Sequence, residues 1–515
     1  MNITDKLALT ARENPTKTAY IFTDKETTYG ELEGMVQKFA DGLQKLGFRQ
    51  GDHIALVLGN SPYYVIGLHG ALRLGLTVIP MNPLYTPTEM AFMLKDGDVK
   101  GIITMDILID KFIPIVDDLP ALEYIINCES GNEVPESIKK DHLPTNILRF
   151  QEVITNGQFP FNGPKLVGED LAVILYTSGT TGKPKGAMLT HKNLYSNAQD
   201  VANYLHINQD DRVIAALPMF HVFCLTVSLN APLLNGGTII ILPQFSPTEV
   251  FRVARAYQAT VFAGVPTMYN YLLQSVKGNV DSFSSLRLCI SGGAAMPVSL
   301  LESFEQAFNV KVSEGYGLSE AAPVTCFNPL DRPRKAGSIG QNIVNVINKV
   351  VDEIGNELPP GEVGELVVQG PNVMKGYYKM EEETAAAIRD GWLYTGDMAR
   401  MDEDGYFYIV DRKKDMILVG GYNVYPREVE EVFYSHPSVV EVAVIGVPDP
   451  QTGEAVIAYV VVDNSDVKEI DLIEFSKQHL AKYKVPQSIS FLEELPKNTT
   501  GKILRKSLKD QVTNS

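Results

Sequence analysis

Short apolar segments alternate with segments of helical apolar spacing along much of this 515-residue chain. Strands that alternate with helices predict parallel βαβ units, because a parallel strand is reached only through a crossover connection. The pattern stands out in two blocks, residues 53–104 and residues 171–314. We therefore predict two layered α/β subdomains before residue 330.

The expected elements follow from the spacing of the apolar residues. In the first block we expect strands at 53–58, 77–80 and 101–104, and helices at 63–74 and 86–94. In the second block we expect strands at 171–175, 213–217, 238–242, 260–264, 286–291 and 311–314, and helices such as 248–257 and 298–308. Residues 1–50 are expected to form helices around a short extended piece at 27–29, and residues 130–168 to form a polar surface connection.

The character of the chain changes after Ala336, where short β-rich pieces are separated by glycine and proline. Pieces such as 345–351 and 365–368 predict a small antiparallel subdomain. From Arg412 onward the pattern is typical of a compact α+β domain. A single domain seldom holds so long a chain. We expect a multidomain α/β and α+β fold, with an N-terminal domain at 1–411 and a mobile C-terminal lid domain at 412–515.

Composition excludes several classes of protein. The chain is 45% hydrophobic and 21% charged, which is typical of a soluble globular protein. A net charge of −17 disfavours general binding to nucleic acid and to anionic membranes. The four cysteines are far apart and form no C-x-x-C pair, so a disulfide framework or a zinc site is not indicated and a cytoplasmic location is expected. We expect no signal peptide and no transmembrane segment, because no apolar run approaches about 18 residues.

The stretch from Tyr176 to Gly186 combines hydroxyls, glycines and lysines directly after an expected strand. Glycine lets backbone N–H groups approach a ligand, hydroxyls add donors and lysine adds positive charge. This combination favours a polyphosphate site over an ordinary surface loop. A Walker A loop is excluded, because Thr177 replaces its first glycine and Pro184 follows Lys183 where a Ser or Thr is needed.

The order Y-T-S-G-T-T-G-x-P-K-G resembles the phosphate loop of the adenylate-forming superfamily, which includes the acyl-CoA synthetases. The resemblance implies that this loop binds the β- and γ-phosphates of ATP. The residues it assigns to the phosphates are Thr177, Ser178, Gly179, Thr180, Thr181, Gly182, Lys183 and Lys185.

The stretch from Glu314 to Glu320 follows another expected strand, and ligands of open α/β sheets lie at the carboxyl ends of strands. We expect a glycine–aromatic–glycine turn that presses against a flat base, followed by a carboxylate suited to Mg²⁺. The equivalent stretch of the superfamily binds adenine, and its final glutamate binds magnesium. By resemblance Gly315, Tyr316, Gly317 and Ser319 contact the nucleotide, with Ser319 in place of the usual threonine, and Glu320 holds Mg²⁺.

Two further motifs, Tyr394-Thr395-Gly396-Asp397 and Asp411-Arg412, contain an acidic and a basic residue. Taken alone, an aspartate in a turn is usually a turn-former, and a lone arginine is usually a solvated charge. By resemblance Asp397 and Arg412 hold the ribose hydroxyls, a role that an acidic residue also has in dinucleotide folds.

His221 lies among aromatic and apolar residues after an expected strand. A single histidine of this kind is usually a core residue, but in the superfamily this motif lines the acyl site. Amino-acid-activating relatives place an aspartate there to pair with the substrate ammonium, so a histidine suits an acid without an amino group. The other residues assigned to the acyl substrate by resemblance are Val222, Gly264, Val265, Ser291, Gly292, Gly293 and Ala294.

The C-terminal motif Pro496-Lys497-Asn498-Thr499-Thr500-Gly501-Lys502 resembles the catalytic lysine loop of the superfamily. The resemblance implies that Lys502 contacts the substrate carboxylate and the α-phosphate. It also implies a hinge at Lys414, two residues after the ribose arginine. Gly420, Gly421 and Tyr422 resemble the hairpin that serves the second half-reaction with CoA.

These motifs occur in family order over nearly the whole chain, so we expect a fatty acyl-CoA synthetase that uses ATP, Mg²⁺ and CoA. Three alternatives stay open: a ligase for short-chain or aryl acids, a domain that loads an acyl carrier protein, and a binding protein with a dead site. Intact Glu320, Asp397, Arg412 and Lys502 argue against the last. Acyl chain length, a homodimer and a transient membrane contact are also left open.

Overall fold

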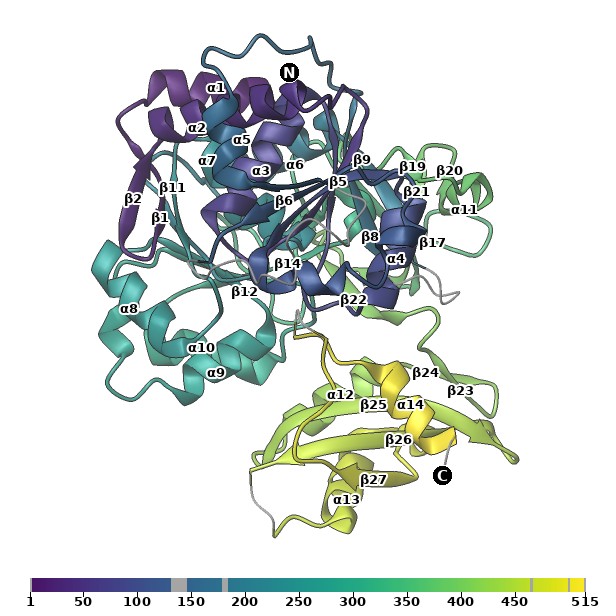
Figure 1. Ribbon diagram of the computed structural model, residues 1–515. Helices are drawn as coiled ribbons and strands as arrows, with labels where there is room; N and C mark the ends of the chain where they lie inside the picture. The colour runs from purple at the N-terminus through teal and green to yellow at the C-terminus, as the bar shows by residue number, and fades with distance from the viewer. Residues whose placement is uncertain (1, 131–145, 178–183, 464–465, 499–500, 514–515) are drawn as a thin grey trace.

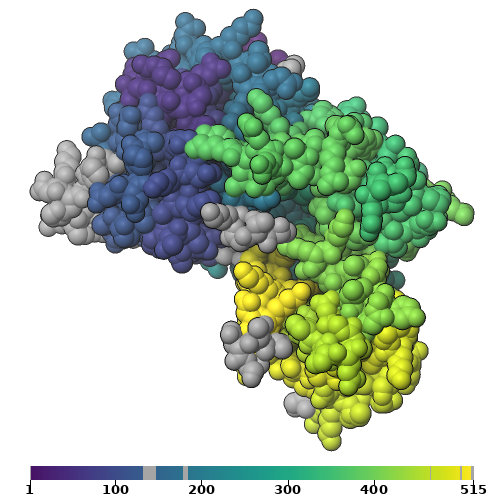
Figure 2. Space-filling view, turned by 90° about the vertical axis from the view of Figure 1, so that its right-hand side faces the viewer, coloured from purple at the N-terminus to yellow at the C-terminus, as the bar shows by residue number. Residues whose placement is uncertain are grey.

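A computed structural model describes residues 2–130, 146–177, 184–463, 466–498 and 501–513 (Figure 1). The chain forms a large lobe and a small C-terminal lobe, and Figures 1 and 2 show the small lobe beside one end of the large one. No helix in the described ranges is long and apolar enough to cross a membrane.

Two mostly parallel sheets build the large lobe. Within the described residues, one sheet has nine strands in the order β16 (Gln341–Asn342), β15 (Val324–Phe327), β14 (Val312–Gly317), β13 (Leu288–Ser291), β12 (Val261–Gly264), β10 (Arg212–Ala215), β11 (Thr238–Ile241), β1 (Thr18–Phe22) and β2 (Lys25–Thr28). The other has eight described strands in the order β19 (Gly376–Tyr377), β9 (Lys185–Thr190), β8 (Leu171–Thr177), β4 (Thr77–Pro80), β3 (His53–Val57), β5 (Val99–Met105), β6 (Tyr124–Cys128) and β7 (Asn146–Arg149). The antiparallel pairs lie toward the ends of each sheet.

Helices cover both faces of both sheets, which confirms the predicted layering. They are α1 (Ile3–Glu13), α2 (Tyr29–Lys45), α3 (Pro62–Leu74), α4 (Pro87–Asp96), α5 (Phe150–Asn156), α6 (His191–Tyr204), α7 (Ala231–Leu234), α8 (Pro247–Tyr257), α9 (Pro266–Gln274) and α10 (Val298–Phe308). Successive strand residues point to opposite faces. Thus Ile54 and Val213 join one core that the two sheets share, while Ala55 and Ile214 join separate cores on the outer faces.

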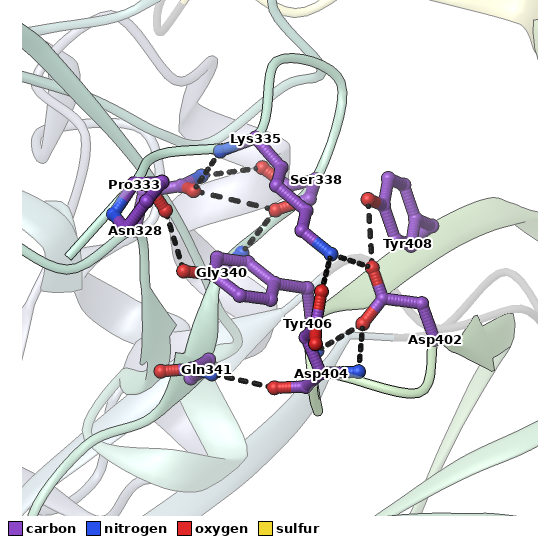
Figure 3. Close-up of polar contacts among 10 residues, drawn as sticks. All are labelled: Asn328, Pro333, Lys335, Ser338, Gly340, Gln341, Asp402, Asp404, Tyr406 and Tyr408. Carbon is purple, nitrogen blue, oxygen red and sulfur yellow. Dashed lines mark hydrogen bonds and ion pairs between the residues drawn. The ribbon is translucent and has the colours of Figure 1, made fainter. Parts of the chain in front are cut away.

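A third sheet is antiparallel, as the sequence predicts for the segment after Ala336. Its strands are β17 (Ile347–Val351), β18 (Gly364–Gln369), β21 (Trp392–Met401), β20 (Ile388–Arg389) and β22 (Phe407–Arg412), with α11 (Glu381–Ala387) beside it. Lys335 links this sheet to the chain that follows β15, because its Nζ lies 2.6 Å from Oδ2 of both Asp402 and Asp404 (Figure 3). Its backbone N–H donates to Oδ1 of Asn328 at 3.1 Å. These contacts hold the turn between β21 and β22 close to the end of β15.

The small lobe wraps helices around its own sheet. Its elements are β23 (Ile417–Val419), β24 (Tyr422–Val424), α12 (Pro426–Tyr434), β25 (Val439–Asp449), β26 (Gly453–Val462), α13 (Glu469–His479), β27 (Ser488–Phe491) and α14 (Arg505–Thr513). In β25, Val442 and Val444 face a core with α12 and α13, whereas Ala443 and Ile445 face a second core with α14. The boundary predicted between residues 411 and 412 falls at the end of β22, and it stays a prediction.

Three local predictions are wrong. Residues 315–317 are not a turn: β14 continues through them and pairs with β15. The polar connection at 130–168 contains β7 and α5, because Phe150 and Val153 are buried against the large core. The N-terminal region contains β1, which pairs with β11 from more than 200 residues away and could not be inferred from local pattern.

Candidate active site

Asp397 and Arg412 lie directly opposite each other on the antiparallel strands β21 and β22. The Arg412 Nε atom is 3.5 Å from Asp397 Oδ1. The hydroxyl of Tyr316, at the end of β14, donates to Asp397 Oδ2. The two motifs assigned to base and ribose therefore meet at one point, and Asp397 is nearly buried there.

Neighbouring residues leave no room for a side chain at the two glycines of the base motif. A Cβ atom added at Gly315 would lie 2.1 Å from Cδ1 of Phe327, and one at Gly317 would lie 2.4 Å from the carbonyl oxygen of Pro323. Both neighbours belong to or precede β15. The glycines let β14 and β15 pair closely, and their contact with a nucleotide base stays a prediction.

Glu320 lies in the short 3₁₀-helix Ser319–Ala321 that follows β14. Burial raises the pKa of its carboxyl above the usual value. Its Oε1 accepts a hydrogen bond from the hydroxyl of Tyr377 at 2.9 Å, and its carbonyl oxygen accepts one from the N–H of Met374 at 2.8 Å. Both partners come from the segment around β19.

The fit of this site to Mg²⁺ follows from its donors. No group of three or more His, Cys, Asp or Glu side chains suited to a metal occurs in the described part of the chain. Protein carboxylates alone would thus not complete a metal site, and Glu320 would depend on oxygens of a phosphorylated substrate. Mg²⁺ is commonly held in this way, by one or two carboxylates and substrate phosphates.

The structure describes only the two ends of the predicted phosphate loop. Thr177 ends β8 and Lys185 begins β9, and the two residues are partners in the β8–β9 hairpin. The Lys185 Nζ lies 5.3 Å from the centre of the Tyr377 ring. The other residues predicted to bind phosphate lie outside the described residues: Ser178, Gly179, Thr180, Thr181, Gly182 and Lys183.

His221 precedes a π-helix at Cys224–Asn230, a distortion often found at functional sites. Its Nδ1 accepts from the backbone N–H of Phe223 at 3.3 Å. Burial, and then the positive charge of Lys502, lower the pKa of His221 to about 4. The ring is therefore neutral near pH 7, with its proton on Nε2 because Nδ1 is an acceptor. The adjacent Val222 is buried.

The other residues assigned to the acyl substrate gather at neighbouring strand ends. Gly264 in β12 and Ser291 in β13 are paired in register, and the buried hydroxyl of Ser291 has no partner among the described residues. A Cβ atom at Gly292 would lie 3.2 Å from the Phe223 ring, and one at Gly293 would lie 3.3 Å from Val265. Gly293 and the next residue, Ala294, are exposed.

The lysine loop of the small lobe reaches this wall of the large lobe. The hydroxyl of Thr267 donates to the carbonyl oxygen of Gly501 at 3.2 Å. Gly501 has φ of +80°, and a Cβ atom there would lie 3.2 Å from Val265. Asn498 closes the loop, since its Oδ1 accepts from the N–H of Lys502 at 2.9 Å. The loop thus brings Lys502 to the acyl and nucleotide residues.

Burial and neighbouring charges shift the pKa of Lys502. Burial, and then the positive charge of Arg412, lower its pKa to about 8, while Asp397 acts in the opposite direction. An ammonium with this pKa stays mostly protonated at pH 7 and is poised to meet an anion.

A cavity of about 1010 Å³ lies between the lobes beside this loop. Residues of both lobes line it, among them Asn60, Leu84, Phe220, Thr267 and Lys497. Its walls are partly apolar, and its size is in the upper range for ligand sites.

The predicted hinge and hairpin are at the start of the small lobe. Lys414 is exposed between β22 and β23. Gly420 and Gly421 have φ of +58° and +85° and form the turn of the β23–β24 hairpin, which only glycine adopts readily. Tyr422 stacks on Tyr483 with ring centres 4.8 Å apart. The hairpin therefore packs on its own lobe.

Tyr377 is the site residue that the sequence did not indicate. It contacts both Glu320 and Lys185, yet it lies in a two-residue strand in an unremarkable Gly-Tyr-Tyr segment. Its position depends on pairing between segments almost 200 residues apart, so no local signal marks it.

Comparisons with known proteins agree with the motifs. The family model described as AMP-binding enzyme matches residues 7–378, and the AMP-binding enzyme C-terminal domain matches residues 428–502. The chain is 41% identical over 523 residues to a long-chain-fatty-acid–CoA ligase of Bacillus subtilis (strain 168), covering 97% of this chain and 92% of that protein. It is 39% identical over 516 residues to a protein of the same name in Escherichia coli O6:H1, with coverages of 96% and 91%.

Among solved structures, the chain is similar to ATP-bound MatB from Rhodopseudomonas palustris, with a TM-score of 0.92 and 33% identity over 100% of this chain and 99% of that one. Apo MatB from the same organism gives a TM-score of 0.80 at 32% identity, with the same coverages. The arrangement described here is therefore closer to the form of MatB that holds ATP.

We expect Lys502 to titrate near pH 8 in the ligand-free protein. Arg412→Gln should raise its pKa by removing a nearby positive charge, and Asp397→Asn should lower it further. The pKa can be measured by NMR of ¹³C-methylated lysines, with Lys502→Arg to assign the signal. Arg389→Gln, an exposed charge change elsewhere, is the control and should leave it unchanged. A Lys502 signal that titrates near the ordinary lysine value of about 10.4 would contradict the described environment.

Proposed function

The chain belongs to the AMP-binding enzyme family, and on this basis we propose that it is an AMP-forming long-chain fatty acid–CoA ligase. In the first step a fatty acid carboxylate attacks the α-phosphorus of ATP, and the bond to pyrophosphate breaks. In the second step the thiol of CoA attacks the carbonyl carbon of the acyl-adenylate, and AMP leaves. The observation that carries the proposal is the entry of Lys502 beside the neutral His221 and the Asp397–Arg412 pair.

The nucleotide would be bound by residues of all three sheets of the large lobe. Asp397 and Arg412 would hold the ribose hydroxyls, since an aspartate accepts readily from a diol. Tyr316 and the backbone of β14 would contact the base. The Thr177–Lys185 loop would bind the β- and γ-phosphates. Mg²⁺ would be held by Glu320 and phosphate oxygens, where its charge would offset that of the phosphates.

Lys502 would stabilise the charge that develops at the α-phosphate. Chemistry of this type depends mainly on positioning and on electrostatic stabilisation, and a preorganised ammonium in a water-poor site supplies both. The lowered pKa supports this role, because the desolvated ammonium gains most when an anion arrives beside it.

The acid would be an aliphatic chain without an ammonium group. His221 is neutral, and Val222, Val265 and Phe223 are apolar. A substrate ammonium would find no carboxylate partner among these residues. A fatty acid requires only apolar walls and one polar end, which the Nε2–H of His221 and Lys502 could contact.

CoA would enter once Lys502 has left, because one site must serve both reactions. We propose that the small lobe rotates about Lys414 and brings Gly420, Gly421 and Tyr422 to the site, while Arg412 stays in β22. Supporting this, Lys414 is exposed at the junction of the lobes and the hairpin turn is already preformed. Such a rotation needs only a few backbone dihedrals.

A cytoplasmic location belongs to the proposal, since the four cysteines are buried free thiols that suit a reducing compartment.

The function is tested by pyrophosphate release with a panel of acids, with and without CoA. We expect aliphatic acids of medium to long chain to be the best substrates, and thioester to form only when CoA is added. Faster turnover of an amino acid, an aryl acid or a short acid would overturn the substrate class. Transfer to an acyl carrier protein but not to CoA would overturn the acceptor, and no pyrophosphate with any acid would overturn the enzyme itself.

Lys502→Ala should slow adenylate formation by about 100- to 1,000-fold, the usual effect of removing one transition-state donor. Thioester formation from supplied acyl-adenylate should change little, because no pyrophosphate leaves in that step. Rapid-quench measurement of each half-reaction checks both values. Lys506→Ala, an exposed lysine nearby, is the matched control. An equal loss in both half-reactions would rule out this role.

Lys414→Pro should leave adenylation largely intact while thioester formation falls by about 100-fold or more. Proline fixes φ near −65° and restricts the preceding residue, so the small lobe could not take its second position. Lys414→Ala removes the same charge but keeps backbone freedom, and it should retain both steps. The half-reactions are assayed separately in both variants. Thioester formation at the wild-type rate in the proline variant would exclude Lys414 as the hinge.

A further inference from the structure

We propose that Tyr377 is a positioning residue that ties the metal-binding carboxylate of Glu320 to the phosphate-binding hairpin. The inference rests on the proposed function, because it assumes that Glu320 meets Mg²⁺ and that Lys185 meets phosphate. It assigns a role to a residue that belongs to none of the predicted motifs.

The hydroxyl of Tyr377 contacts the carboxylate of Glu320. It donates to Oε1 of Glu320 at 2.9 Å. A carboxylate on a short helix can turn about its side-chain bonds, and a hydrogen bond from a fixed donor selects one orientation. Groups that orient a metal ligand in this way usually contribute strongly to metal affinity.

The ring of Tyr377 contacts the ammonium of Lys185. The ammonium of Lys185 lies 5.3 Å from the ring centre, which is within the range of a cation–π contact. Lys185 is the last residue of the phosphate loop and the register partner of Thr177. One side chain thus contacts a carboxylate through its hydroxyl and an ammonium through its ring face.

Tyr377 can act as a support because its own backbone is fixed on two sides. In β19 it pairs with Ala187 of β9, so it moves with the phosphate hairpin. Its N–H donates to Oγ1 of Thr384 at 2.8 Å. On the other side, the N–H of Met374 donates to the carbonyl oxygen of Glu320 at 2.8 Å. The segment 374–377 therefore bridges a loop of the nine-stranded sheet and a hairpin of the eight-stranded sheet.

The next residue offers a matched control. The hydroxyl of Tyr378 donates to Oδ2 of Asp98 at 2.9 Å, and Lys379 lies 5.0 Å from the centre of its ring. Tyr378 thus has the same pair of contacts, with an acid and a lysine that belong to no predicted motif. Tyr→Phe at 377 and at 378 makes the same chemical change and differs only in which acid loses its donor.

The test measures ATP binding by isothermal titration calorimetry, once with excess Mg²⁺ and once with EDTA. Tyr377→Phe should weaken binding of ATP with Mg²⁺ by about tenfold, and should leave binding in EDTA within twofold because the ring still faces Lys185. Tyr377→Leu should weaken both. Tyr378→Phe should change neither, and circular dichroism with thermal melting confirms that each variant is folded.

A double-mutant cycle with Glu320→Gln separates positioning from general support. If Tyr377 acts through Glu320, Tyr377→Phe should cause no further loss of Mg²⁺-dependent binding once Glu320 is changed. Three results would overturn the inference: Tyr377→Phe that binds like Tyr378→Phe, equal losses with Mg²⁺ and with EDTA, or additive losses in the double variant. Wild-type binding that does not depend on Mg²⁺ would instead overturn the role proposed for Glu320, and the inference with it.

Discussion

Like charges gathered at the junction of the two lobes are the constraint on which the rest of the site depends. Lys502 enters a position crowded by Arg412, Arg505 and Lys414, with Asp397 as the opposing charge. Desolvating an ammonium among cations is unfavourable unless an anion compensates it. A triphosphate brings that anion, so ligand binding would stabilise the arrangement in which both lobes meet. The positive charge of the site would therefore be balanced only when the anionic substrate is bound.

A hydrogen bond connects the small lobe to the strand that carries Arg412, and an ion pair lies beside it within the small lobe. The carboxylate of Glu430 accepts from Nη2 of Arg505 at 2.7 and 2.8 Å, which joins α12 to the start of α14. The carboxylate of Asp411 accepts from the N–H of Arg427 at 2.9 Å, and burial raises its pKa to about 6. Polar contacts between domains leave relative motion as the default, which suits a lobe that must change position between two reactions.

Much of the fold could be predicted because it follows from local pattern. The strands and helices of the two α/β layers agree with the expected segments, since a short continuous apolar run marks a strand buried on both faces and period-3.6 spacing marks a helix with one buried face. Failures came where pairing with another segment overrides the local preference. Gly315 to Gly317 resemble a turn but continue a strand because β15 lies beside them, and β1 exists because β11 supplies its partner.

The sequence by itself determined the chemistry: which side chains carry charge, which segments form most of the two α/β layers, and the order of motifs that marks an AMP-binding enzyme. Tertiary structure alone decided the distances between those groups and hence their electrostatic state. The neutral His221, the lowered pKa of Lys502 and the bridge from Tyr377 to Glu320 depend on residues that are tens to hundreds of positions apart. Burial and Coulomb interactions depend on proximity in space, and no local pattern records it.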